Sequence, residues 1–294
     1  MACWARMAGN YELQIASSLG FCGGVRRAMD AFKRLRAETP VAEPVYVLHE
    51  LVHNYTVTEQ MRSHGAVFIA TSGELPEGAT CLIGAHGVGP ETEQLLRERA
   101  GCLVDATCPI VKRVQQIAAQ LRSDEALVLL GVRGHPEAEG ILNHARTARR
   151  FLVTSVEEIA SLPELSKPVF LCQTTLGHEQ SDRVFAALQA RFPDARRDGS
   201  ICHASSERQS AVEDLVKRID LLLVIGSSHS SNANRLREIG EKAEVPSMLI
   251  EGPEQLPDNL SRFHRIGVSA GASTPDEQIS RTLDEIRSRL KLTD

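Results

Sequence analysis

Three cysteines divide the chain into thirds of almost equal length, and each one stands directly before a helical pattern. Cys22 precedes GGVRRAMDAFKRL, Cys108 precedes PIVKRVQQIAAQL and Cys202 precedes HASSERQSAVEDLVKR. The intervals are 86 positions (22 to 108) and 94 positions (108 to 202), and 92 residues (202 to 294) follow the third. A supersecondary pattern that recurs at a nearly fixed interval indicates an internal repeat. The sequence therefore predicts three similar units.

Two sets of apolar strand patterns follow in the thirds, and every one of them ends in polar residues. The first set covers 45–54, 126–137 and 221–232, and its polar ends are His53, His135 with Glu137, and Ser230, Ser231 and Asn232. The second set covers 81–87, 169–175 and 265–273, and its polar ends are His86, Thr174 with Thr175, and Ser273. His53, His135 and Ser230 lie 31, 27 and 28 positions after the cysteine of their own third. The polar ends therefore belong to the repeat.

Helical stretches at 57–65, 90–100, 181–192, 232–243 and 275–290 separate these strands. Strands that alternate with helices favour parallel sheets, so we expect an α/β fold of three similar units. The expected boundaries are 23–107, 108–201, and 202–294 together with an N-terminal strand at 11–22. Ligands of such sheets bind beyond the carboxyl ends of the strands, where the polar residues lie. Three like units favour one shared central site; the alternative is three units in a row without a common centre.

Charge and hydropathy limit the class of protein. The net charge is −5, and no basic run has interleaved aromatic residues, so we expect neither nucleic acid nor a membrane surface as a partner. The N-terminal MACWARMAGN lacks the apolar core of a signal peptide. The longest apolar runs, 126–132 and 219–226, are too short to span a bilayer. These features predict a cytoplasmic protein.

A reducing compartment does not favour a disulfide framework among the seven cysteines. Cys81 and Cys172 stand inside apolar strand patterns, and we expect small buried side chains there. Cys102 opens a strand and is expected to pack as well, and Cys3 is close to the N-terminus. The three cysteines of the repeat differ from these, because the mouth of a helix favours the thiolate.

Three thiolates from three units can meet at a metal. The sequence lacks the close Cys-x2-Cys pairs that structural zinc sites favour. Iron–sulfur clusters normally have four thiolate ligands, so three cysteines would leave one iron of a [4Fe–4S] cluster open to a substrate. The alternative is three ordinary structural cysteines. The threefold repeat favours the cluster.

The polar strand ends suit an anion. Histidine, hydroxyl and amide groups near helix N-termini are typical of phosphate or diphosphate sites. The nucleotide-binding motifs GxGxxG and GxxxxGK[ST] do not occur in the expected places, so we expect the anion to belong to a small molecule. Glu137 is the one carboxylate beside a histidine at a strand end, and it can serve as a proton donor. The alternative is a first-turn glutamate stabilised by the helix dipole.

Eight ordered motifs between Leu13 and Asp276 resemble those of one family: GFCGGV, HELVHN, AHGV, DATCP, GHPEAEG, QTTL, GSSHSSNANRL and GASTPD. They are similar to the motifs of 4-hydroxy-3-methylbut-2-enyl diphosphate reductases, which close the methylerythritol phosphate route to isoprenoid precursors. The resemblance implies a pseudo-threefold trefoil of α/β units around a central [4Fe–4S] cluster. The implied ligands are Cys22, Cys108 and Cys202, with one iron lacking a protein ligand. Gly23 and Ser205 depart from the usual motifs, and neither is an implied ligand.

The resemblance also implies a reaction and a role for each polar strand end. Reductases of this family carry out a two-electron reductive dehydration that yields isopentenyl diphosphate and dimethylallyl diphosphate. Glu137 would supply a proton, and Thr174 would position the substrate hydroxyl. The residues implied to bind the diphosphate are His53, His86, His135, Thr175, Ser230, Ser231, Asn232 and Ser273. Ferredoxin or flavodoxin would supply the electrons, in keeping with the lack of a nicotinamide or flavin motif.

Two other functions fit part of this pattern. A cluster-binding sensor or scaffold explains the cysteines but leaves Glu137, Thr174 and the anion-binding residues without a role. A zinc-dependent hydrolase of small phosphate esters would use a mixed Cys/His site. The hydrolase predicts a colourless zinc protein, whereas the cluster predicts a brown iron protein.

Overall fold

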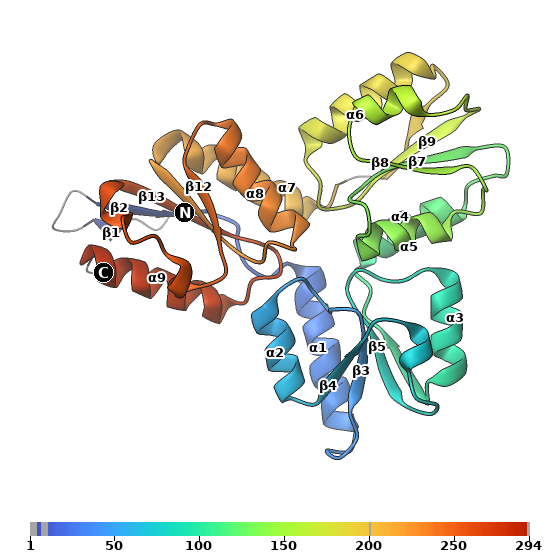
Figure 1. The fold of residues 1–294 in the computed structure, drawn as a ribbon, viewed down its shortest axis with the longest axis horizontal. Helices are drawn as coiled ribbons and strands as arrows, with labels where there is room; N and C mark the ends of the chain where they lie inside the picture. Colours follow the sequence, from blue (N-terminus) through green and yellow to red (C-terminus); the bar gives the residue numbers. More distant parts are fainter. Residues whose placement is uncertain (1–4, 7–10, 200, 293–294) are drawn as a thin grey trace. The chain divides into compact units, whose positions relative to one another are not determined.

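A computed structural model of the chain describes residues 5–6, 11–199 and 201–292. The chain separates into two compact units. The first unit comprises Met1–Gly23, His53–Tyr55 and His203–Asp294, and the second comprises Gly24–Val52 and Thr56–Cys202. Both units are built from sheets with helices packed on their faces (Figure 1).

One five-stranded sheet forms the centre of the first unit. Its strands lie in the order β1 (Ala5–Arg6), β2 (Glu12–Ile15), β13 (Arg265–Ala270), β11 (Leu221–Ile225) and β12 (Ser247–Ile250). All neighbouring pairs are parallel except β1 with β2. The helices of this unit are α7 (His203–Leu215), α8 (Ser231–Lys242) and α9 (Asp276–Leu290). Alternate residues of β11 enter different core clusters, since Leu223 packs with Ile286 of α9 and Val224 with Leu236 of α8.

Two four-stranded parallel sheets form the second unit. One has the order β4 (Ala66–Ile69), β3 (Val45–Leu48), β5 (Thr80–Ile83) and β6 (Cys102–Asp105). The other has the order β10 (Arg196–Arg197), β9 (Pro168–Cys172), β7 (Ala126–Leu130) and β8 (Arg150–Val153). The helices are α1 (Gly23–Glu38), α2 (Tyr55–Ser63), α3 (Pro90–Arg99), α4 (Pro109–Ala119), α5 (Pro136–His144) and α6 (His178–Arg191).

Helix α4 joins the two sheets of the second unit. It follows β6 of the first of these sheets, but its side chains Val114 and Ala118 pack with Leu129 of β7 in the second. Helix α5 packs beside α4 and completes the same core cluster through Ile141. The loop that ends in Cys108 is therefore held between the two sheets of its own unit.

The three sheets share one pattern of connections. With β1 left aside, the orders β12-β11-β13-β2, β4-β3-β5-β6 and β8-β7-β9-β10 are equivalent, and all their pairs are parallel. In each sheet the final strand of this order is the one that precedes a cysteine: β2 precedes Cys22, β6 precedes Cys108 and β10 precedes Cys202. The prediction of an α/β fold with three similar parallel-sheet units is confirmed. The boundaries at 23–107, 108–201 and 202–294 with 11–22 stay a prediction.

The cysteines outside the repeat lie partly as expected. Cys81 and Cys172 are buried, as predicted. The prediction for Cys102 is wrong, because its side chain is exposed where β6 begins at the edge of its sheet. Cys3 lies outside the described residues.

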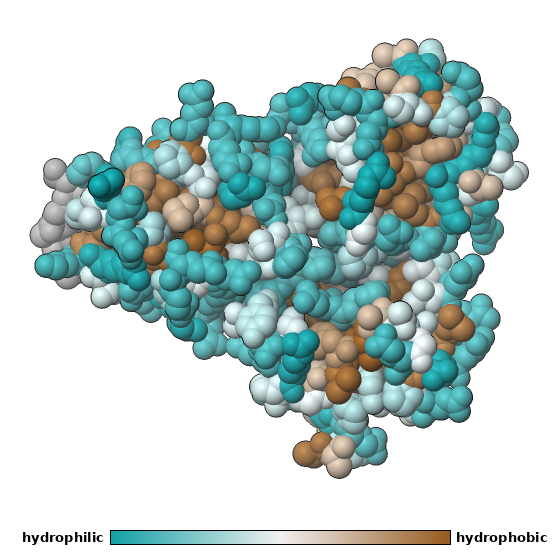
Figure 2. All heavy atoms as spheres, viewed as in Figure 1, coloured by the Kyte–Doolittle hydropathy of each residue, from teal (hydrophilic) through white to brown (hydrophobic). Residues whose placement is uncertain are grey.

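The visible face of each unit is mostly hydrophilic (Figure 2). Among the described residues, no helix combines the length and the apolar character that crossing a membrane requires.

Candidate active site

The three cysteines of the repeat occupy equivalent places in the backbone. Each stands one residue before a helix, α1, α4 or α7, and each donates its backbone N–H to a carbonyl beyond the end of a strand. The donor–acceptor pairs are Cys22 to Ala272 at 3.2 Å, Cys108 to Ala85 at 3.0 Å and Cys202 to Thr174 at 2.9 Å. Each acceptor lies two positions past its strand, which ends at Ala270, Ile83 or Cys172. The fold therefore fixes all three cysteines by the same contact.

The side chains of Cys22, Cys108 and Cys202 are half-buried, whereas Cys81 and Cys172 are buried. Burial raises the pKa of the Cys81 thiol to about 11, and burial also raises the pKa of Cys172. A thiol with a raised pKa stays protonated at neutral pH and is a poor metal ligand. The environments of the five side chains thus separate three candidate ligands from two packing residues.

A second equivalence links the other polar strand ends. His53, His135 and Ser230 each lie five positions past a strand, which ends at Leu48, Leu130 or Ile225. His135 caps α5, because its Nδ1 accepts the N–H of Glu137 at 3.1 Å. Ser230 caps α8, because its Oγ accepts the N–H of Ala233 at 3.3 Å. Polar side chains at these helix N-termini are suited to anions.

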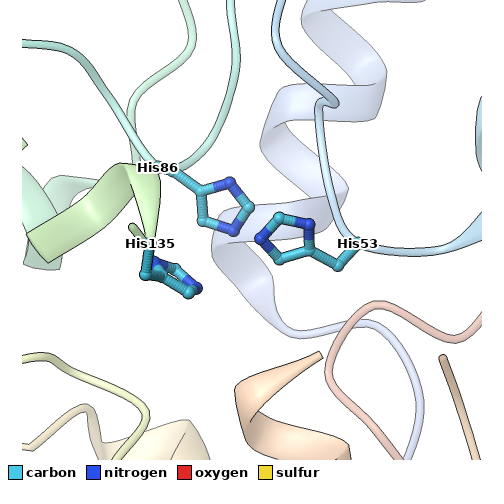
Figure 3. Close-up of side chains that lie close together, drawn as sticks. All are labelled: His53, His86 and His135. Carbon is cyan, nitrogen blue, oxygen red and sulfur yellow. The ribbon is translucent and has the colours of Figure 1, made fainter. Parts of the chain in front are cut away.

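In the second unit, the imidazole rings of His86 and His135 meet edge to face (Figure 3). Their centroids are 5.2 Å apart and their planes are inclined at 80°. Because Nδ1 of His135 accepts a hydrogen bond, the proton of the neutral ring is on Nε2, which can then donate to an anion. His53, also drawn in Figure 3, belongs to the short segment of the first unit.

Glu137 lies in the first turn of α5 with only 1% of its surface exposed. Its Oε1 accepts the backbone N–H of Thr174 at 2.6 Å. Burial raises the pKa of the Glu137 carboxyl, and this effect outweighs the hydrogen bonds from Thr174, which act in the opposite direction. A carboxyl group in such a place keeps its proton more readily than an exposed one. Glu137 and Thr174 are thus joined by a buried hydrogen bond within the second unit.

The first unit presents buried hydroxyl and amide groups. Ser230, Asn232 and Ser273 are buried, and Ser231 is half-buried. Oδ1 of Asn232 accepts the N–H of Ala272 at 2.9 Å, the same residue whose carbonyl accepts the N–H of Cys22. Nδ2 of Asn232 is buried and has no hydrogen-bond partner among the described residues. A buried donor without a partner is unfavourable unless a ligand supplies the acceptor.

Residues 13–287 match the model of the LytB protein family. The chain belongs to this family. Its relatives include proteins named 4-hydroxy-3-methylbut-2-enyl diphosphate reductase from Ralstonia nicotianae and 4-hydroxy-3-methylbut-2-enyl diphosphate reductase 2 from Bradyrhizobium diazoefficiens. The first is 37% identical over 94% of this chain and 86% of the relative, and the second is 40% identical over 94% and 91%.

Two solved structures are similar to this LytB family chain. The E-1-hydroxy-2-methyl-but-2-enyl-4-diphosphate reductase of Plasmodium falciparum has a TM-score of 0.88 and 29% identity, covering 92% of this chain and 86% of that one. A structure described as (E)-4-hydroxy-3-methyl-but-2-enyl diphosphate reductase, the terminal enzyme of the non-mevalonate pathway, has a TM-score of 0.67 and 31% identity. It covers 93% of this chain and 98% of its own. Membership of a family of such reductases implies a metal cofactor.

The LytB family protein divides the predicted site residues between its two units. The second unit holds Cys108, Cys202, His86, His135, Glu137, Thr174 and Thr175, and the first holds Cys22, His53, Ser230, Ser231, Asn232 and Ser273. One buried residue in the second unit, Gln173, was missed by the sequence analysis. Its place between an apolar strand and two threonines was the available signal.

Proposed function

We propose that this chain is an iron–sulfur oxidoreductase that converts 4-hydroxy-3-methylbut-2-enyl diphosphate to isopentenyl diphosphate and dimethylallyl diphosphate. The observation that carries the proposal is the shared backbone contact of Cys22, Cys108 and Cys202, which gives three equivalent thiols in a LytB family chain. Relatives named as this reductase over 94% of the chain support the same substrate.

Cys22, Cys108 and Cys202 would hold a [4Fe–4S] cluster. The residues fit this cofactor, because each thiol is half-buried and stands at a helix N-terminus, where the helix dipole stabilises negative charge on sulfur. When bound, such a cluster supplies electrons one at a time and, at the iron without a protein ligand, a Lewis acid for a hydroxyl group.

The diphosphate would be bound by hydrogen-bond donors at the polar strand ends. Nε2–H of His135 and the partnerless Nδ2 of Asn232 support this role most directly. The other proposed contacts are His53, His86, Thr175, Ser230, Ser231 and Ser273. Charge-assisted hydrogen bonds to phosphate oxygens are among the stronger polar contacts in proteins. Such a set holds the substrate by its anionic end and leaves its hydroxyl end to be positioned separately.

Glu137 would supply a proton, and Thr174 would position the substrate hydroxyl beside it. Overall, two electrons and two protons enter; the allylic C–O bond breaks, its oxygen leaves as water, and one C–H bond forms. The burial that raises the pKa of Glu137 favours its protonated form and also removes water from the place where its proton would be used. The hydrogen bond from the Thr174 N–H would hold the Glu137 carboxyl group in place before the substrate arrives.

The electrons would come from a protein donor, either ferredoxin or flavodoxin. This part of the proposal rests on the lack of a nicotinamide or flavin motif in the sequence and on the single-electron chemistry of the cluster. We also propose that the protein acts in the cytoplasm.

The test is an anaerobic assay with reduced methyl viologen as the electron source. We expect a brown, iron-containing protein that consumes the allylic diphosphate and forms both isoprenoid diphosphates. An iron protein without turnover would favour the sensor or scaffold. A colourless zinc protein that releases phosphate would favour the hydrolase instead.

A further inference from the structure

Gln173 lies at the junction between two polar strand ends of the second unit. It directly follows β9 and directly precedes Thr174. Its backbone N–H donates to the carbonyl of Leu130 at 2.8 Å, which continues the pairing of β9 with β7 by one residue. Its side chain is fully buried, with 0% exposed. A buried amide at this point must have partners for both of its polar ends.

Both ends of the Gln173 side chain bind loops that carry proposed site residues. Oε1 accepts the backbone N–H of Val132 at 3.0 Å, in the loop that leads to His135. Nε2 donates to Oγ1 of Thr175 at 3.1 Å. The orientation of the amide follows from chemistry, because the N–H of Val132 can only donate and must face the oxygen. The nitrogen therefore faces Thr175.

This orientation decides what the hydroxyl of Thr175 can do. The amide nitrogen of Gln173 can only donate, so Oγ1 of Thr175 is the acceptor in their hydrogen bond. The hydroxyl proton is thus directed away from Gln173 and stays available for another acceptor. Thr175 is half-buried, so a ligand can reach it.

We propose that Gln173 is a positioning residue that fixes the Thr175 hydroxyl as a donor to the substrate diphosphate. This inference rests on the proposed function, since it takes the ligand to be a diphosphate. Gln173 contacts Val132 in the loop after β7 as well as Thr175 after β9. Its effect on the anion passes through Thr175.

The experiment measures binding of inorganic pyrophosphate by calorimetry to anaerobically prepared protein with its iron loaded. Gln173→Met keeps the length of the side chain and removes the donor, and we expect about tenfold weaker binding. Thr175→Val removes the hydroxyl, and we expect a loss of about 10- to 100-fold, as for a hydrogen bond to a charged group. Thr175→Ser keeps the hydroxyl and should bind normally.

The decisive variant is the double change Gln173→Met with Thr175→Val. If Gln173 acts through Thr175, adding Gln173→Met to Thr175→Val should weaken binding less than twofold further. A full tenfold further loss would mean that Gln173 acts through the fold in general, and would overturn the inference. Gln173→Glu serves as a second variant if Gln173→Met does not fold, because it retains an acceptor for Val132.

Gln14→Met is the matched control, since Gln14 is a buried glutamine of β2 in the other unit. We expect it to leave pyrophosphate binding and iron content unchanged. If Gln173→Met and the unaltered protein bind pyrophosphate equally well, the inference about Gln173 is overturned but the proposed function is not. Absence of binding by the unaltered, iron-loaded protein would instead contradict the proposed function.

Discussion

The backbone N–H of Thr174 donates to Oε1 of Glu137 at 2.6 Å, although the two residues are 37 positions apart in the sequence. The contact joins the loop after β9 to the first turn of α5, which follows β7. The carbonyl of the same Thr174 accepts the N–H of Cys202. One peptide segment thus positions both a candidate proton donor and a candidate metal ligand.

Replacing Glu137 by Gln should slow turnover without weakening the binding of iron or pyrophosphate. Glu137→Gln can still accept the N–H of Thr174 and touches no cysteine, so iron content and pyrophosphate affinity should stay normal. Turnover should fall by about 10² to 10⁴, the usual contribution of a positioned acid. Anaerobic kinetics with iron analysis checks this. Near-normal turnover at normal iron content would assign the proton to another source.

His135→Asn should mainly weaken pyrophosphate binding and affect turnover little, the reverse of Glu137→Gln. Asparagine is a good N-cap, so the start of α5 should persist, but its shorter side chain loses the Nε2–H donor. We expect a pyrophosphate affinity about 10- to 100-fold lower and a much smaller change in turnover at saturation. An unchanged affinity would remove His135 from the diphosphate set.

Serine substitutions should sort the cysteines into two classes. Cys22→Ser, Cys108→Ser or Cys202→Ser should each strip iron and abolish activity. Cys81→Ser and Cys172→Ser should retain iron and lose only stability, by roughly 1–3 kcal/mol for placing a hydroxyl in a buried position. Iron analysis after anaerobic purification decides this. Loss of iron in Cys172→Ser, with retention in Cys202→Ser, would reverse the ligand assignment.

Asn232→Asp tests the partnerless amide of the first unit. The carboxylate can still accept the N–H of Ala272, but it replaces the donor Nδ2 with a negative charge. We expect pyrophosphate binding to weaken by about 100-fold or more, from the lost hydrogen bond and the added repulsion. Unaltered pyrophosphate binding by Asn232→Asp would exclude Asn232 from the anion site. Asn143→Asp, at an exposed position of α5, provides a comparison for the added charge.

Strands with strong, repeated apolar patterns could be predicted from the sequence. The apolar runs of β7, β9 and β11 are buried along their whole length, so both their existence and their polar ends were readable. The strands β4, β8 and β12 were missed, because they are short and only partly buried at the edges of their sheets. An edge strand with exposed positions carries a weak pattern.

Candidate site residues could be proposed from their types and positions in the sequence, but the contacts between them could not be predicted. Glu137 was singled out because it follows a histidine at a strand end, but its partner Thr174 is remote in sequence. The proposed role of Gln173 depends on the register of β7 against β9, which brings Gln173 beside Leu130 and Val132. Register is set by the packing of the whole sheet, so one strand alone does not reveal it.

The raised pKa of Glu137 predicts how stability depends on pH. Its ordinary value is 4.5, and burial raises the pKa in the folded protein. Above pH 4.5 the folded protein holds a proton that the unfolded chain has released, so Glu137 lowers stability progressively as the pH rises towards the folded pKa. Glu137→Gln removes this effect. The stability difference in favour of the variant should therefore be constant below about pH 4.5, grow by up to about 1.4 kcal/mol per pH unit above it, and level off above the folded pKa.

For Glu125→Gln, we expect the effect of the substitution on stability to have the opposite sign to that of Glu137→Gln. Hydrogen bonds from the backbone of Arg122 and from Arg196 hold the pKa of Glu125 below its ordinary value. Its carboxylate therefore stabilises the fold at neutral pH, and this contribution is lost as the pH falls below 4.5 towards the folded pKa. Thermal unfolding of the iron-loaded proteins between about pH 3 and pH 8 measures both variants, because the Glu125 effect falls below pH 4.5 and the Glu137 effect above it. If the Glu137→Gln difference did not change with pH, Glu137 would have the same pKa folded and unfolded, and it would not hold its proton as the proposed mechanism requires.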